Sequence, residues 1–337
     1  MKNFFKNSSK PLLIAEISGN HNGNKKRFLN LIESAFKNGA DMVKIQTYEP
    51  QDITLKTKNK KFMIRRGIWS KEYLWQLYEK AHTPFSWHSD AFKIAKKFNR
   101  QLFSSPFSIR AVDLLEKFNV QFYKLASFEI TDFKLIRYIA KKNKPILIST
   151  GISNIQEIKN AIKVVNKYHN KIIIMHCVSN YPTKLEDVNL SRINKLKKIF
   201  KNYKIGYSDH TDDIISSVAA SVMNISVIEK HFNIDNKKTT DSDFSIKPKQ
   251  LKALSKILND LHTKKKIKND QRSNFLNLKR SIFAIKDIKK NETINEKNID
   301  TLRPKIGLCS SKYFKIIGKK SKKFIKSGSP IYKNYLN

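Results

Sequence analysis

Eight short apolar segments, each ending in a polar or ionisable residue, constrain the fold of this chain more than any other feature. They span residues 12–16, 42–46, 102–105, 122–127, 145–150, 172–176, 205–210 and 225–231. The intervals between them are long enough for a helix each, and strands that alternate with helices form parallel sheets. Eight such units predict an α/β fold, a closed (β/α)8 TIM barrel with the polar strand ends gathered on one rim. The pattern is typical of an enzyme.

The chain also extends beyond the barrel. Its 337 residues exceed the roughly 250 of a typical barrel, which predicts an additional small domain. We expect the barrel domain over residues 1–262, a charged linker over 263–277 and a C-terminal domain over 278–337. In the last segment, short β-type runs alternate with turns, for example at Asn291 and Gly328, which predicts a β-rich domain.

A long insertion, residues 54–98, follows the second predicted strand. It contains all three tryptophans of the chain, Trp69, Trp75 and Trp87, together with further aromatic residues. Our interpretation is a helix pair packed against the barrel. A lid or a subunit contact is the alternative.

The formal net charge of +39 raises nucleic-acid binding as a different function, because basic surfaces attract phosphate backbones. The charge is spread along the chain and comes mostly from lysine, and no zinc-finger or other nucleic-acid-binding motif accompanies it. We therefore attribute it to compositional bias and expect no nucleic-acid partner.

Several features bear on the cellular compartment. No apolar run approaches the ~18 residues of a membrane helix, so no membrane association is expected. The first ten residues are polar and lack the apolar stretch of a secretory signal. The two cysteines, Cys177 and Cys309, provide no disulfide framework. These features predict a cytoplasmic protein.

Two histidines close consecutive predicted strands. His210 ends the segment YSDH and His231 ends IEKH, so the two should be neighbours on the barrel rim. Two neutral imidazoles there suit a divalent cation such as Mn²⁺ whose other positions are open to water or substrate. Two hydrogen-bonded histidines without a metal are the alternative.

Two lysines interrupt otherwise apolar runs. Lys44 and Lys124 must reach an anion or be paired, because an isolated buried ammonium is costly. Hydroxyl side chains are expected at the same level on other strands: Ser105, Ser127, Ser149, Thr150 and Ser208. Cations encircled by hydroxyl donors predict a phosphate or phosphocarboxylate site. Core hydroxyls with lysines that extend to solvent are the alternative.

Four carboxylates are placed to contact a polyhydroxylated substrate or to move protons: Glu16, Glu129, Glu229 and Asp241. For Glu229, neutralisation of a lysine is an equal alternative. His176 is expected to be a hydrogen-bonded core residue, with orientation of a neighbouring ligand as the alternative.

Ordered motifs along nearly the whole chain resemble the sialic acid synthase family. They are AEISGNHNG (15–23), VKIQTY (43–48), FSSPF (103–107), YKLASFE (123–129), ISTGIS (148–153), NYPT (180–183), GYSDHT (206–211) and EKHF (229–232). RSIFAIKDIKKNETI and the LRP at 302–304 resemble that family's antifreeze-like (SAF) domain.

The resemblance implies a transferase that condenses phosphoenolpyruvate with an N-acetylated amino sugar to give a nonulosonic acid and phosphate. It implies phosphoenolpyruvate binding by Lys44, Ser105, Lys124, Ser127, Ser149 and Ser208. It implies a metal, Mn²⁺ or alternatively Mg²⁺ or Co²⁺, on His210 and His231, and sugar contacts from Glu16, Gln46, Tyr181 and Asp241. Glu16, Glu129, Lys44 and Lys124 are the implied catalytic residues, and which carboxylate is the base stays open.

The resemblance further implies a domain-swapped homodimer, because Arg303 matches an arginine that the family's C-terminal domain places over the partner's sugar site. Members usually have glycine soon after this Arg-Pro, whereas here Lys305 follows and Gly307 comes later. A lysine adopts positive φ less easily than glycine, so the loop is expected to differ there.

Within the family the sequence is most similar to pseudaminic acid synthases, through SFE at 127–129, IQTY at 45–48, TPFSWH at 83–88 and DSDFS at 241–245. The implied sugar is 2,4-diacetamido-2,4,6-trideoxy-β-L-altropyranose, and the product would serve surface or flagellar glycosylation. Apolar contacts from Phe128 or Phe244 would favour its 6-methyl group. N-acetylneuraminate or legionaminate synthesis is the nearest alternative. A nucleic-acid-binding protein is a distant one, and a non-catalytic surface or ice-binding protein is a third.

Overall fold

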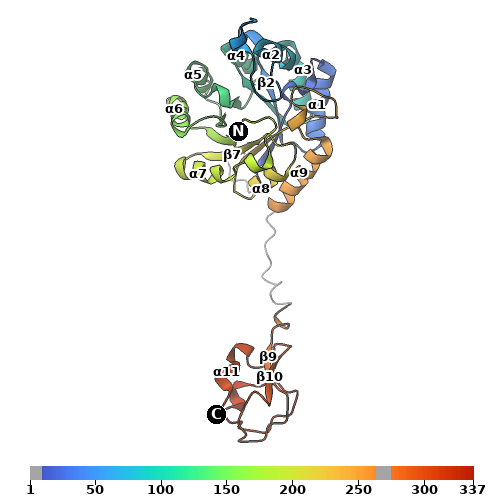
Figure 1. The fold of residues 1–337 in the computed structure, drawn as a ribbon, viewed down its shortest axis with the longest axis vertical. Helices are drawn as coiled ribbons and strands as arrows, with labels where there is room; N and C mark the ends of the chain where they lie inside the picture. The colour runs from blue at the N-terminus through green and yellow to red at the C-terminus, as the bar shows by residue number, and fades with distance from the viewer. Residues whose placement is uncertain (1–9, 263–274) are drawn as a thin grey trace. The chain divides into compact units, whose positions relative to one another are not determined.

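The computed structural model describes residues 10–262 and 275–337. They belong to two compact units that follow one another along the chain. The predicted linker, 263–277, lies largely outside the described residues. The first unit is a closed barrel of eight parallel strands in sequential order (Figure 1). The strands are β1 (Leu12–Glu16), β2 (Met42–Thr47), β3 (Gln101–Pro106), β4 (Tyr123–Leu125), β5 (Ile146–Ser149), β6 (Ile172–Cys177), β7 (Lys204–Asp209) and β8 (Val227–His231). The predicted (β/α)8 fold is therefore confirmed.

Helices follow every strand and surround the barrel (Figure 1). They are α1 (Lys25–Lys37), α2 (Leu74–Ala81), α3 (His88–Lys97), α4 (Ile109–Lys117), α5 (Phe133–Lys141), α6 (Ile155–Asn166), α7 (Ser191–Ile199), α8 (Ile215–Ser221) and α9 (Pro248–His262). Among the described residues, none of the helices combines the length and the apolar character that crossing a membrane would take.

Local sequence explains where several helices begin and end. At the start of α6, the Asn154 side chain accepts from the Glu157 amide, and the Glu157 carboxylate accepts from the Asn154 amide, both at 2.9 Å. This capping box pairs two amides that a helix leaves free. Helices α3, α4 and α5 are each followed two residues later by an asparagine with positive φ: Asn99, Asn119 and Asn143. Asparagine tolerates this left-handed conformation better than most residues and so ends these helices.

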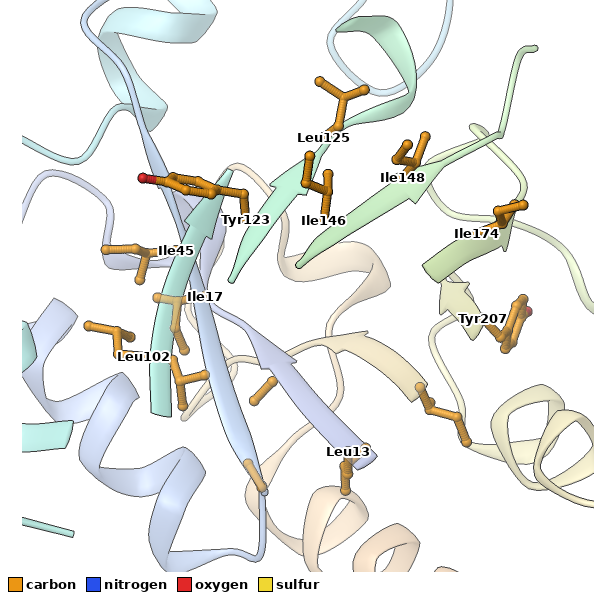
Figure 2. Close-up of a cluster of buried hydrophobic side chains, with 14 of the residues drawn as sticks. Leu13, Ile17, Ile45, Leu102, Tyr123, Leu125, Ile146, Ile148, Ile174 and Tyr207 are labelled. Atoms are coloured by element: carbon orange, nitrogen blue, oxygen red, sulfur yellow. The ribbon is translucent and has the colours of Figure 1, made fainter. Parts of the chain in front are cut away.

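Along each strand, successive side chains alternate between the outer and the inner face of the barrel. Outer side chains pack with the apolar faces of the helices, and Figure 2 shows Ile45, Leu102 and Tyr123 in this layer. Inner side chains fill the lower part of the barrel: Ile14, Met42, Phe103, Phe122, Leu147, Ile173, Met175 and Val227. Burial on both faces accounts for the almost uninterrupted apolar runs in the sequence.

The insertion after β2 contains the predicted helix pair, α2 and α3, and a loop before it. Residues 63–73 form this loop, which is closed by the Met63–Tyr73 bridge and by a 2.8 Å hydrogen bond from the Ile64 amide to the Glu72 carbonyl. Trp87 lies in the core against Phe28. The packing interpretation therefore describes part of the insertion, and the loop contributes to the site described below.

The second unit has its own small core. Strands β9 (Ser281–Ala284) and β10 (Ile299–Leu302) pair antiparallel, and α11 (Tyr313–Ile316) covers a cluster of isoleucines that includes Ile282 and Ile331. The positive φ after the Arg-Pro pair lies at Gly307 (φ 85°) and not at Lys305. A Cβ at Gly307 would lie 2.6 Å from the Ile331 carbonyl oxygen, so glycine is required there for space as well as for conformation.

Candidate active site

The carboxyl ends of the barrel strands and the loops after them enclose a cavity. Fourteen of the predicted site residues line it: Lys44, Gln46, Lys124, Ser127, Phe128, Glu129, Ser149, Tyr181, Ser208, His210, Glu229, His231, Asp241 and Phe244. Most project from the inner face of a strand, one step above the apolar layer. The same alternation that fills the barrel therefore delivers these groups to one place.

An ion-pair network forms the floor of the cavity. The Lys124 ammonium lies 2.9 and 2.8 Å from the two carboxylate oxygens of Glu229. The Lys44 ammonium lies 2.6 Å from Glu16 Oε2 and 3.2 Å from Glu229 Oε1. These four residues are at most 4% exposed. Glu229 therefore pairs with both lysines, which corresponds to the charge-neutralising role rather than to the substrate-binding or proton-transfer role.

Burial and charge act in opposite directions on these four groups. Burial raises the pKa of Glu16, although Lys44 opposes the shift. Burial would also raise the pKa of Glu229, but Lys124 and Lys44 outweigh it and hold that pKa well below its usual range. Burial likewise lowers the pKa of Lys124 despite Glu229. Glu16 is therefore the carboxylate that a proton neutralises more easily, and its protonation leaves the network with a net positive charge for an anion.

The predicted hydroxyl groups differ in whether they contact this network. Ser208 Oγ donates to Glu229 Oε1 at 3.1 Å, and Ser127 Oγ lies 3.1 Å from Ser179 Oγ. Ser105 Oγ accepts from Lys44 at 3.4 Å. Thr150 instead donates to the Met175 carbonyl at 3.0 Å and does not line the cavity, so its hydroxyl serves the packing of the strands.

His210 and His231 lie side by side, with ring centroids 5.4 Å apart. His210 Nδ1 donates to the Val178 carbonyl at 2.6 Å, which places the ring's lone pair on Nε2. That atom lies 3.4 Å from Ser208 Oγ, whose proton is donated to Glu229. His231 Nδ1 is buried and has no hydrogen-bond partner. Burial lowers the pKa of His210 to about 4 and that of His231 well below its ordinary value, so both rings are neutral at pH 7.

This chemistry fits a divalent cation, which binds neutral imidazole nitrogen. Within residues 10–262 and 275–337, no group of three or more His, Cys, Asp and Glu side chains is arranged as a metal site. A cation on the two histidines would accordingly take its other ligands from water or substrate.

An aromatic wall rises above the histidines. Tyr181 lies 4.5 Å from His210 and 5.1 Å from Phe244 between ring centroids, and Trp69 lies 5.5 Å from Tyr181. Asp241 begins the turn that carries Phe244, and its Oδ2 lies 3.7 Å from His231 Nδ1. Burial raises the pKa of Asp241. The upper cavity thus combines apolar rings with a few polar groups, as small-molecule sites do.

Glu129 also lines the cavity, from the short turn Ser127–Glu129 after β4. Its Oε2 is buried without a hydrogen-bond partner. Burial, with a contribution from the Asp132 carboxylate, raises the pKa of Glu129 to about 7. A carboxyl group with this pKa is suited to proton transfer near neutral pH.

Some predicted residues lie outside the cavity lining. Glu16 and Ser105 are buried behind it, against Lys44. Arg303 follows β10 in the second unit and is exposed. His176 is a buried core residue, since its Nε2 donates to the Val188 carbonyl at 2.9 Å and its ring stacks on Tyr207.

Other lining residues escaped the sequence analysis as members of the site. They include Trp69 and Tyr78 from the insertion, Tyr48 and Phe107 after two strands, and Cys177 at the end of β6. The position of Cys177 could have been predicted from the sequence, because Cys177 follows Met175 by two residues on the inner face of β6. The position of Trp69 could not have been predicted, because the sequence of a loop does not show which way a side chain points.

Comparison with known proteins agrees with this geometry. Pseudaminic acid synthase of Helicobacter pylori is 39% identical over 330 residues, covering 95% of this chain and 96% of the relative. Pseudaminic acid synthase of Campylobacter jejuni is 38% identical over 339 residues, covering 97% of each chain. N,N'-diacetyllegionaminic acid synthase of Campylobacter jejuni is 36% identical over 320 residues, covering 92% of this chain and 95% of the relative.

The fold has solved counterparts as well. A crystal structure of N-acetylneuraminic acid synthetase from Leptospira borgpetersenii, in complex with citrate, superposes with a TM-score of 0.69 at 26% identity, covering 79% of this chain and 91% of that one. The SAF domain model matches residues 279–336, and the NeuB family model matches residues 31–269, which hold most of the cavity. The barrel, the motifs on its inner face and the near full-length identity lead to one conclusion: the chain belongs to the NeuB family.

Proposed function

We propose that this chain is a pseudaminic acid synthase, which condenses phosphoenolpyruvate with 2,4-diacetamido-2,4,6-trideoxy-β-L-altropyranose to give pseudaminic acid and phosphate. The observation that carries the chemistry is the pair of buried lysines, Lys44 and Lys124, on the floor of a cavity whose rim bears two neutral histidines. The near full-length identity to synthases of that name supports the choice of sugar.

Phosphoenolpyruvate would occupy the cavity floor. Its phosphate and carboxylate need cationic and hydrogen-bonding partners, which the two lysines and the hydroxyls of Ser127, Ser149 and Ser208 supply. Ser105 supports Lys44 from behind. The carboxylates now paired with the lysines would share them with the substrate, and protonation of Glu16 would ease that exchange.

The sugar would lie above, between the histidines and the aromatic wall, with Gln46, Tyr181 and Asp241 as polar contacts. His210 and His231 would hold a divalent cation, Mn²⁺ being our first choice, which supplies Lewis-acid polarisation of the sugar aldehyde. The methylene carbon of phosphoenolpyruvate forms a bond to the aldehyde carbon, whose oxygen takes up a proton. Water then adds to C2 of the former phosphoenolpyruvate, which the new bond leaves cationic, and gives up a proton. The resulting tetrahedral intermediate expels phosphate and leaves the 2-keto acid.

Glu129 is the group placed to move a proton in these steps, because it lines the cavity and its pKa lies near 7. Glu16 is buried against Lys44, so we assign it to tuning the charge of that lysine.

We also propose a cytoplasmic homodimer in which Arg303 of one subunit completes the sugar site of the other, with a product that serves surface or flagellar glycosylation. Mixing two inactive variants tests the exchange. Lys124→Ala and Arg303→Ala proteins, combined after partial unfolding and refolding, should regain activity, because a mixed dimer contains one intact site. No recovery would contradict the domain swap.

The function is tested by phosphate release from phosphoenolpyruvate with Mn²⁺ and one of three acceptors: the trideoxy-altrose, N-acetylmannosamine or the legionaminic acid precursor. We expect turnover with the first and none in a Lys44→Ala control. Turnover with only one of the other sugars would overturn the proposed substrate, and none with any sugar would overturn the synthase assignment.

A further inference from the structure

Trp69 reaches the cavity from a loop that otherwise faces solvent. It lies near the tip of the 63–73 loop, and its neighbours Ile68 and Ser70 are exposed whereas Trp69 is partly buried. Its indole Nε1 donates to the Thr240 carbonyl at 3.1 Å, 171 residues away in sequence. One side chain therefore ties the insertion to the segment after β8 that carries Asp241.

The ring of Trp69 extends the aromatic wall outward. It stands edge to face with Phe244, with centroids 6.2 Å apart, and tilts against Tyr181 at 5.5 Å. Phe244 in turn lies 4.7 Å from His231. The wall runs without interruption from the histidines to the loop.

Within this wall, the side chains of Trp69 and Phe244 have no hydrogen-bonding capacity left for a ligand. The indole N–H, which is the only polar group of Trp69, is engaged by Thr240, and Phe244 has no polar atom. A sugar hydroxyl pressed against these two rings would lose its water without gaining a partner, whereas a methyl group would gain from burial.

We propose that Trp69, together with Phe244, forms the subsite that selects acceptor sugars with a methyl group in place of a hydroxymethyl group at carbon 6. The inference rests on the proposed function, because it deepens the choice of sugar at the same site. Apolar pockets reject an added hydroxyl by factors on the order of 10 to 100, so a preference of this size is expected.

The test measures kcat and KM for the trideoxy-altrose, for N-acetylmannosamine and for phosphoenolpyruvate in two variants. Trp69→Ala removes the ring and the hydrogen bond, whereas Trp69→Phe keeps a smaller aromatic ring and loses the bond to Thr240. We expect Trp69→Ala to raise the KM of the trideoxy sugar roughly tenfold, to reduce the preference over N-acetylmannosamine by a similar factor, and to leave the KM of phosphoenolpyruvate within about twofold. Trp69→Phe should retain most of the preference.

Trp75 provides the matched control. It lies on α2, does not line the cavity, and donates its Nε1 to Glu79 at 3.2 Å. Trp75→Ala should leave both sugar constants and the preference unchanged. Melting curves of each variant establish that the barrel is folded.

Two results would overturn the inference: an unchanged preference in Trp69→Ala, or an equal loss for both sugars and for phosphoenolpyruvate, which would indicate a structural role. Failure of the proposed function is distinct, because it appears in the wild-type protein as turnover of another sugar or of none.

Discussion

A buried ion pair beside the two histidines leads to a quantitative prediction. Lys230 and Asp209, each the direct neighbour of a histidine, face one another across β7 and β8, with Nζ 3.1 Å from Oδ1 and both side chains fully buried. Asp209 Oδ2 also accepts from the hydroxyls of Ser216 and Ser217, each at 2.6 Å. The pair therefore joins the two strands that carry His210 and His231.

The two partners should not be equally costly to remove. Lys230→Met leaves a carboxylate that retains its two serine hydroxyls and the Thr211 amide at 2.9 Å. Asp209→Asn leaves an ammonium group in hydrogen-bond contact with neutral acceptors alone, namely the carbonyl and hydroxyl of Thr211 and the amide oxygen of the substituted side chain. Breaking a buried pair costs about 3 to 5 kcal/mol, and we place Lys230→Met near the lower end and Asp209→Asn near the upper. The double variant should cost less than the sum by at least about 1 kcal/mol.

Urea unfolding followed by tryptophan fluorescence measures these costs. Because all three tryptophans lie in the barrel unit, the signal reports on the barrel alone. Mn²⁺ affinity, measured by electron paramagnetic resonance under conditions where each variant is folded, should fall about 10- to 100-fold in both single variants, because the histidines lose their support. Leu115→Ala, a fully buried position on α4, is the control: it should cost about 2 to 5 kcal/mol and leave Mn²⁺ affinity unchanged. Variants that lose stability but bind Mn²⁺ as tightly as this control would refute the reasoning.

Three further predictions concern single residues. Since burial raises the pKa of Glu129 from its ordinary value of 4.5 to about 7, the folded protein holds a proton that the unfolded chain releases, so stability should fall as the pH rises from about 4.5 to about 7. Melting temperatures across this range should show that slope in the wild type and a weaker one in Glu129→Gln; equal slopes would contradict the assignment. His210→Ala should abolish Mn²⁺ binding in calorimetry while circular dichroism shows an intact fold, and retained binding would remove the histidine from the proposed metal site. Gly206→Ala should cost about 1 to 3 kcal/mol in urea unfolding, because the new Cβ would lie 2.3 Å from the Met175 sulfur, and an unchanged midpoint would show that this side chain moves aside easily.

The barrel and the inner face of its strands could be predicted because both follow from periodicity. Lys44 and Lys124 stand out as charges in apolar runs, and the period of two then places them inside the barrel. The same rule predicts the level of Ser149 and Ser208. Which carboxylate pairs with which lysine could not be predicted, because strand pairing fixes the level of a side chain but not its rotamer.

Contributions from loops were the least predictable part of the site. The aromatic residues of the insertion suggested packing, and for Trp87 that is what the structure shows. Trp69 belongs instead to the cavity because a hydrogen bond to Thr240, far away in sequence, turns its ring inward. The resemblance of the motifs brought in Tyr181, which also lies on a loop that periodicity does not reach.

The alternation along each strand also explains why the lysines remain in the site. Each of the four residues in the ion-pair network follows an apolar residue two positions earlier on the same inner face. These apolar residues are Ile14 before Glu16, Met42 before Lys44, Phe122 before Lys124 and Val227 before Glu229. This apolar layer fills the barrel below the ion pairs and denies the lysine side chains a path to solvent in that direction, which argues against lysines that extend out of the barrel. The excluded water also strengthens every charge interaction above it, so an anion that enters from the open rim meets partners that are close, fixed and poorly screened. Filling the lower barrel with apolar side chains therefore serves the chemistry at its upper end.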